Sequence, residues 1–110
     1  MSRSTPPHFK FDFDPNGSLV NAAAAVPVLQ RLMEYERVAI FETPIPQHDI
    51  LGNRQIRARI DRSLAMHFGS PSYVTAVSEE VCDGFVVNGG ATQVLRQGRL
   101  SEEVAMPFWL

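Results

Sequence analysis

The sequence predicts an α/β fold in which short buried strands alternate with amphipathic helices, arranged as an incomplete barrel. Three observations support this prediction: the regular alternation of apolar runs with helical patterns, the short connections, and polar side chains at the ends of successive strands. Such alternation is typical of parallel sheets built from right-handed crossovers. With 110 residues, the chain has the length of one domain, but a closed barrel of eight such units takes roughly 250 residues.

The first predicted strand covers residues 8–14 and has two different faces. Its aromatic side chains alternate strictly with polar ones, namely Phe9, Phe11 and Phe13 with His8, Lys10, Asp12 and Asp14. In a barrel the polar face would point inward and bring Asp14 to the mouth, while the aromatic face would pack against helices. The Ala-rich segment that follows has helical spacing over residues 26–33 and contains Pro27, where a proline tends to kink a helix.

Three further strand–helix units and a final strand follow along the chain. Strands are predicted at residues 37–42, 64–66, 84–88 and 107–110, and helices at about 50–60, from a Ser70–Pro71 cap to about 81, and from 89–90 to about 104. The predicted order is therefore β-α-β-α-β-α-β-α-β. Open doubly wound sheets usually have a G-x-G-x-x-G loop after the first strand, and the Asp-Pro-Asn-Gly found here does not match it. We therefore prefer a barrel.

The composition indicates a packed globular domain without a membrane span. Hydrophobic residues make up 45% of the chain, charged residues 20%, and the net charge is −2. We expect residues 9–110 to form the domain and the polar segment 1–8, which lacks the apolar core of a signal peptide, to be disordered. No apolar run approaches the ~20 residues that a membrane span needs, so a cytoplasmic location is the default expectation.

Basic residues and cysteine give no sign of a nucleic-acid or disulfide function. The ten Lys and Arg are scattered except for Arg54, Arg57, Arg59 and Arg62, which helical spacing would spread over a solvated face, so we expect no nucleic-acid binding. Cys82 is the only cysteine. An internal disulfide is therefore impossible, and a buried structural thiol is the expected role.

Four successive predicted strands end in a polar side chain, namely Asp14, Glu42, His67 and Asn88. The first two intervals, 42 − 14 = 28 and 67 − 42 = 25 residues, are each about one strand–helix unit. Neighbouring strands lie ~4.8 Å apart, so side chains that end adjacent strands can converge on one cation. We predict a divalent metal site formed by Asp14, Glu42 and His67.

Each of these residues also has a purely structural interpretation. Asp-Pro-Asn-Gly is a strong type I turn sequence, in which Asp14 would only cap a turn. Glu42 follows a mainly apolar run and needs a partner, for which a simple Arg or Lys would suffice. His67 could be a neutral, hydrogen-bonded barrel histidine. Asn88 precedes Gly-Gly and is more often a turn residue than a catalytic one.

Four segments resemble the middle of the catalytic barrel of the enolase superfamily, in its mandelate racemase/muconate lactonizing enzyme group. They are Asp14–Gly17 (D-P-N-G), Phe41–Pro44 (F-E-T-P), Pro46–Gly52 (P-Q-H-D-I-L-G) and Gly89–Thr92 (G-G-A-T). The resemblance implies a partial (β/α)8 TIM barrel, roughly strands three to seven, over most of the chain. It also implies that Asp14, in a D-x-N motif, and Glu42, in an E-x-P motif, are two magnesium-binding carboxylates.

The sequence departs from this family at three places. The family's fifth strand ends in an acidic ligand, whereas this chain has His67, and imidazole suits Mn, Fe or Zn better than Mg. The loop after Asn88 is shorter than the family's. The second-strand K-x-K base motif, the eighth strand and the capping domain have no counterpart in these 110 residues.

The resemblance implies abstraction of the proton α to the carboxylate of a small substrate, assisted by Mg or Mn. Racemisation, elimination and cycloisomerisation all branch from that step. No base can be assigned, because Lys10 lies four residues before Asp14, about 13 Å along the strand. We therefore expect the chain alone to be inactive, and whether it is an enzyme stays open. The alternatives are a non-catalytic barrel remnant that self-associates through exposed strand edges, and an unrelated small binding domain.

Overall fold

A single parallel sheet organises the protein, whose computed structural model describes residues 10–69 and 71–109. The elements in chain order are β1 (Phe11–Phe13), α1 (Ala22–Leu32), β2 (Val38–Glu42), α2 (Ile50–Arg59), β3 (Ser63–His67), α3 (Tyr73–Ser78), β4 (Gly84–Val86), α4 (Ala91–Glu103) and β5 (Phe108–Trp109). The predicted order of strands and helices is confirmed. The expected segment 1–8 and the start of the first predicted strand lie outside the described residues.

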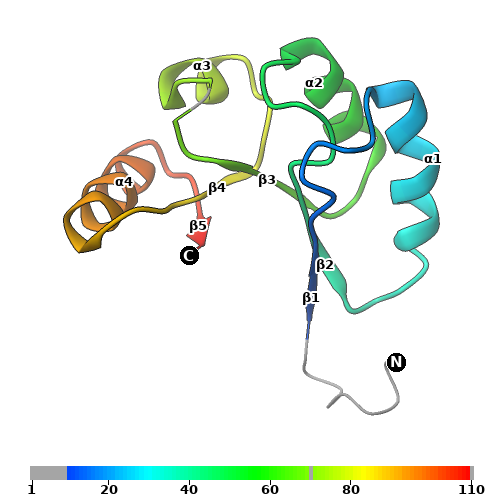
Figure 1. The fold of residues 1–110 in the computed structure, drawn as a ribbon, viewed down its shortest axis with the longest axis horizontal. Helices are drawn as coiled ribbons and strands as arrows, with labels where there is room; N and C mark the ends of the chain where they lie inside the picture. Colours follow the sequence, from blue (N-terminus) through cyan, green and yellow to red (C-terminus); the bar gives the residue numbers. More distant parts are fainter. Residues whose placement is uncertain (1–9, 70, 110) are drawn as a thin grey trace.

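The sheet has the strand order β1-β2-β3-β4-β5, and each neighbouring pair is parallel. Figure 1 shows the strands as a curved inner layer with helices α1 to α4 on its outer side. A doubly wound sheet would reverse its strand order in the middle, whereas here each new strand adds to the same edge. The architecture is a half-barrel, which confirms the predicted partial α/β barrel.

The core lies between the sheet and the helices. In α1, Ala22, Ala25 and Leu29 recur at helical spacing and are buried, and they pack with Phe41 of β2 and Ile56 of α2. The Asn21 side chain accepts a hydrogen bond from the Ala24 N–H (2.9 Å) and so begins α1. Pro27 lies inside this helix, which continues through it to Leu32.

Helix α3 is shorter than predicted and begins later. The cap is Ser72, whose hydroxyl accepts from the Thr75 N–H (3.3 Å), and not the predicted Ser70, which lies outside the described residues. The helix ends at Ser78 because Glu80 adopts a left-handed backbone with φ of 55°. The apolar residues up to Val81 do not extend the helix, since a left-handed residue cannot continue a right-handed one.

The edge strand β5 depends on the absence of a side chain at Gly84. A Cβ atom there would lie 2.7 Å from the Pro107 carbonyl oxygen and would overlap the Trp109 ring. Gly84→Ala is therefore expected to displace β5 and cost about 1–3 kcal/mol of unfolding free energy. Trp109 is the only tryptophan, so a red shift of the fluorescence emission measures the displacement.

The matched control is Gly90→Ala, because a Cβ at Gly90 meets no atom within 4 Å. That variant should keep the wild-type emission. A Gly84→Ala protein with an unshifted spectrum and unchanged urea midpoint would contradict the tight packing of β5 on β4.

Candidate metal centre

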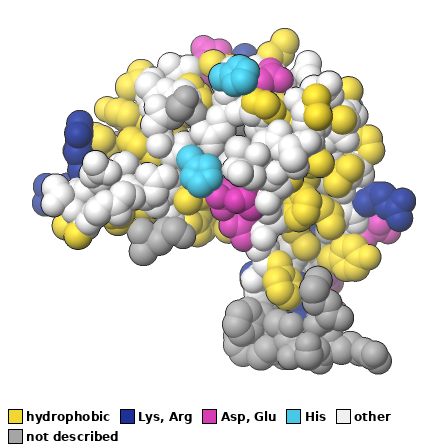
Figure 2. Space-filling view, in the orientation of Figure 1, with side chains coloured by type: hydrophobic (Ala, Val, Ile, Leu, Met, Phe, Trp, Pro, Cys, Tyr) yellow, Lys and Arg dark blue, Asp and Glu magenta, His cyan; other side chains and the backbone are white. Residues whose placement is uncertain are grey.

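Three of the strand-end side chains meet at the carboxyl edge of the sheet. Asp14 follows β1 directly, Glu42 ends β2 and His67 ends β3. One ligand atom from each of the three lies within 4.8 Å of the other two. Figure 2 shows a histidine beside acidic side chains on the inner side of the curved sheet. The structure thus brings together the three residues that the sequence selected; their binding of a metal stays a prediction.

Glu42 is the buried member of this group. The residue is 7% exposed, and its Oε2 lies 3.0 Å from His67 Nε2. The pKa of the Glu42 carboxyl is raised to about 8, first by burial and then by the nearby carboxyls of Asp12 and Asp14 through hydrogen bonding and charge. The partner that Glu42 needed is therefore a histidine, set among acidic groups, and not the Arg or Lys of the structural interpretation.

Asp14 both caps a turn and faces the cluster. Its Oδ1 accepts a hydrogen bond from the Asn16 N–H at 2.8 Å. The turn differs from the predicted type I turn over Asp14–Gly17: its hydrogen bond joins the Ser18 N–H to the Pro15 carbonyl (3.1 Å), and both Asn16 and Gly17 have positive φ. Asn and Gly are the residues that tolerate this backbone, which explains the shift of the turn by one residue.

Asp12 lies beside the site, although it is not one of the three predicted ligands. Its carboxyl lies near enough to that of Glu42 to raise the Glu42 pKa through hydrogen bonding and charge. Asp12 lies on β1, two residues before Asp14, so the two side chains point to the same face. This alternation was the available signal, since it places Asp12 on the inward face together with Asp14.

Two other polar candidates lie outside the cluster. Asn88 is exposed, and its backbone N–H donates to Gln97 Oε1 at 3.0 Å. Lys10 is exposed and precedes β1, at the opposite end of that strand from Asp14. Neither residue is placed to act on a molecule bound at Glu42.

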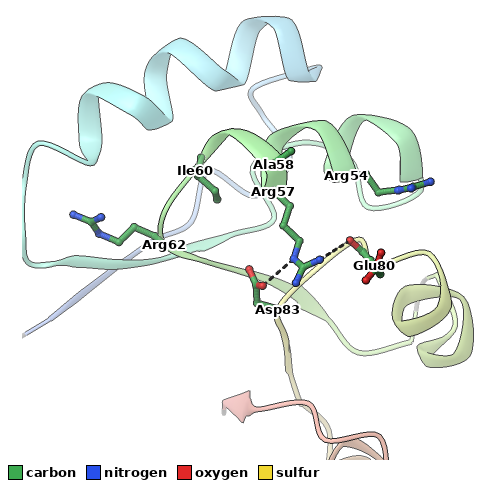
Figure 3. Close-up of a pocket in the computed structure, with 7 residues that line it drawn as sticks. All are labelled: Arg54, Arg57, Ala58, Ile60, Arg62, Glu80 and Asp83. Atoms are coloured by element: carbon green, nitrogen blue, oxygen red, sulfur yellow. Dashed lines mark hydrogen bonds and ion pairs between the residues drawn. The ribbon is translucent and has the colours of Figure 1, made fainter.

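A cavity of about 360 Å³ lies away from this cluster, at the amino ends of the strands. Its lining residues are Arg54, Arg57, Ala58, Ile60, Arg62, Glu80 and Asp83. Figure 3 shows Arg57 directed at Asp83 and Glu80, while Arg54 and Arg62 point away from them. Three separately directed arginines do not form a convergent anion site.

The arginines of this cavity hold the elements together. Arg57 Nε donates to Asp83 Oδ1 (2.8 Å), and Asp83 Oδ2 accepts from the Leu64 N–H (2.7 Å). Arg62 Nε donates to the Val38 carbonyl at 2.8 Å. The expectation that the arginine cluster forms a solvated face is therefore wrong for Arg57 and Arg62, because tertiary partners from other elements pair with them.

Cys82 is a buried thiol, as predicted, at 3% exposure. Burial raises the pKa of this thiol to about 12. A protonated, inaccessible thiol is a poor nucleophile and metal ligand. In the part of the chain that the structure describes, the helices are also too short or too polar to cross a membrane.

Comparison with known proteins identifies solved structures with a similar fold. No protein-family model and no curated protein matches the sequence. Among solved structures, an enolase from Bradyrhizobium complexed with magnesium and mandelic acid is 20% identical, with a TM-score of 0.80 over 97% of this chain and 31% of that one. A dipeptide epimerase from Enterococcus faecalis, complexed with Mg and the dipeptide L-Leu-L-Tyr, is 17% identical, with a TM-score of 0.81 over 97% and 32%.

A mandelate racemase/muconate lactonizing family protein from Azoarcus sp. is similar to the same extent: 18% identical, with a TM-score of 0.81 over 97% of this chain and 30% of that one. The chain thus spans about a third of the length of each of these proteins. The resemblance noted in the sequence is confirmed in the fold: residues 10–69 and 71–109 adopt the half-barrel arrangement found in enolase-superfamily structures.

Proposed function

We propose that Asp14, Glu42 and His67 bind a divalent cation that assists removal of the proton α to the carboxylate of a small substrate. The observation that carries this proposal is the approach of their three ligand atoms to within 4.8 Å of one another, at the ends of adjacent strands. The comparisons support it, since the enolase-superfamily structures with this fold include one complexed with magnesium and mandelic acid.

The donor set fits a cation. Carboxyl groups of Glu42, Asp12 and Asp14 crowd together, and their mutual repulsion helps to raise the pKa of Glu42. A bound dication would remove that repulsion and favour the ionised carboxylates. Because one donor is an imidazole nitrogen, the set suits Mn, Fe or Zn better than Mg.

When bound, the cation would stabilise the negative charge that develops on the substrate carboxylate as the α-proton leaves. The residues of this chain have the complementary roles. Glu42 and Asp14 supply oxygen ligands, and His67 supplies a nitrogen ligand in place of a third carboxylate. The substrate would be a small carboxylate, the class to which the mandelic acid and the dipeptide in the neighbouring structures belong.

The metal preference gives the direct test of this proposal. Purified protein should bind Mn²⁺ and Zn²⁺ more tightly than Mg²⁺ in calorimetric titrations, and His67→Glu should reverse the order by providing a third oxygen ligand. His48→Glu is the matched control, because His48 is an exposed histidine outside the cluster. Absence of Mn²⁺ and Zn²⁺ binding to the wild-type protein would refute the site.

We further propose that the 110-residue chain alone turns over no substrate. The described half-barrel leaves Asp14 exposed and the His67 side chain 39% exposed, so bulk water reaches the site. Lys10, the only lysine, lies at the far end of β1. A missing base costs roughly 10²–10⁴ in rate. Deuterium exchange into mandelate, followed by NMR, should not exceed that of the metal alone; faster exchange would contradict this.

Self-association is the second candidate function, favoured by exposed apolar side chains on helix α4 and on the edge strand β5. Leu95 of α4 is 70% exposed and Phe108 of β5 is 37% exposed. An open parallel edge beside such side chains tends to pair with another chain. Size-exclusion chromatography with and without Mn²⁺ separates the two candidate functions. Discrete, metal-dependent assembly supports the metal site, whereas metal-independent association supports a non-catalytic barrel remnant.

A further inference from the structure

We infer that Gln47 is a positioning residue whose carboxamide holds the main chain of His67 and thereby fixes where the imidazole lies. This inference rests on the metal site proposed above. Gln47 lies in the loop between β2 and α2, and its Oε1 accepts a hydrogen bond from the His67 N–H at 2.7 Å. Its Nε2 donates to the His67 carbonyl at 3.2 Å.

The position requires a carboxamide because β2 stops pairing before β3 ends. The last main-chain bond from β2 to β3 runs from the Thr43 N–H to the Ala65 carbonyl (3.0 Å), after which Pro44 lacks an N–H. His67 is paired on its other side, in register with Val86 of β4. Gln47 offers one acceptor and one donor, as a peptide group does, and so replaces the missing neighbour.

Gln47 is itself held in place. Thr43 Oγ1 donates to Gln47 Oε1 at 3.0 Å. Thr43 has φ of 45°, an uncommon conformation for a β-branched residue that persists only where its surroundings enforce it. Below the loop, the buried Asn53 donates from Nδ2 to the carbonyls of Pro46 (3.1 Å) and Asp49 (2.9 Å). These hydrogen bonds therefore fix the loop from which the Gln47 side chain reaches His67.

The imidazole needs this support because packing does not fix it. Its side chain is 39% exposed, and its Nε2 lies 3.0 Å from Glu42 Oε2. The direction of the Cα–Cβ bond, set by the main chain that Gln47 holds, decides whether Nε2 points at the cation or past it. The partners that orient a metal ligand affect affinity in this way in other metal sites.

The experiment measures Mn²⁺ and Zn²⁺ affinity of the 110-residue chain by calorimetry. Gln47→Ala is expected to weaken both about 10–100-fold. Gln30→Ala is the matched control, because Gln30 Nε2 also donates to a main-chain carbonyl, that of Arg59, between α1 and α2. The control should stay within about twofold of wild type.

A double-mutant cycle separates positioning from general support of the fold. In a His67→Ala background, Gln47→Ala should cause no further loss of affinity, because nothing is left for it to position. An equal loss in that background, or no loss in the wild-type background, would overturn the inference and leave the metal site standing. Wild-type protein that binds neither Mn²⁺ nor Zn²⁺ would overturn the site first and the inference with it.

A measurement without metal distinguishes loss of the two hydrogen bonds from loss of folding. Gln47→Met keeps the length of the side chain but removes both hydrogen bonds, so the His67 amide should exchange its hydrogen faster than in wild type while the circular dichroism spectrum stays the same. Unchanged exchange of the His67 amide in folded Gln47→Met would also overturn the inference.

Discussion

Glu42→Gln is expected to weaken Mn²⁺ and Zn²⁺ binding at about pH 8 by roughly 100-fold or more, because loss of a direct ligand should cost at least as much as loss of an outer-shell partner, whose upper end is about 100-fold. Glu42 is the buried member of the cluster, and its carboxylate lies between Asp12, Asp14 and His67. The amide keeps the size of the side chain but carries no charge for the cation. Calorimetric titration measures the loss, and Glu34→Gln, at an exposed position, is the matched control.

The effect of Glu42→Gln should depend strongly on pH. The Glu42 pKa is about 8 in the metal-free protein, so below that pH a cation must displace a proton. Wild-type affinity should therefore rise about tenfold per pH unit up to pH 8, while the variant lacks the contribution of this group. Equal pH dependence of the two proteins would show that Glu42 is not a ligand.

The same variant should be more stable than wild type when no metal is present. A carboxyl whose pKa is raised from 4.5 to about 8 binds its proton more tightly in the folded state than in the unfolded state. The contribution of Glu42 to wild-type stability is therefore greatest below about pH 4.5 and declines as the pH rises to 8. Glutamine removes this decline. Urea unfolding at both pH values tests it, and a variant less stable than wild type at pH 8 would contradict it.

Phe41→Ala is expected to cost about 3–5 kcal/mol of unfolding free energy. Phe41 is fully buried between the sheet and helices α1 and α2, and its ring meets the edge of Phe13 at a centroid distance of 6.3 Å. Removing the ring leaves a cavity that the surrounding residues fill only in part. Since small domains are stable by about 5–15 kcal/mol, the loss is a large share of the total.

Phe108→Ala is the matched control for this prediction. Phe108 is the same residue type but is 37% exposed on the edge strand β5, so its truncation should cost much less. Urea titrations followed by circular dichroism give both values. If the two variants lost similar amounts, the core would not lie on the helix-covered side of β2.

Local patterns allowed most of the fold to be predicted. The predicted strand at residues 37–42 differs by one residue from β2, and the helix at about 50–60 matches α2, because apolar runs and helical spacing reflect burial on one face or both. The prediction failed at α3. There, apolar residues continue to Val81, but the left-handed Glu80 ends the helix, and spacing does not reveal a backbone reversal.

The candidate site also has features that follow from the sequence and features that only the tertiary structure shows. The amino-acid sequence by itself determined that Asp14, Glu42 and His67 end successive strands, because parallel strands of one sheet bring their carboxyl ends to one edge. The tertiary structure alone decided that burial and the nearby Asp12 raise the Glu42 pKa, and that Gln47 holds His67 from 20 residues away. Such contacts depend on strand register, on burial and on the path of a loop. None of these can be read from residues that are adjacent in the sequence.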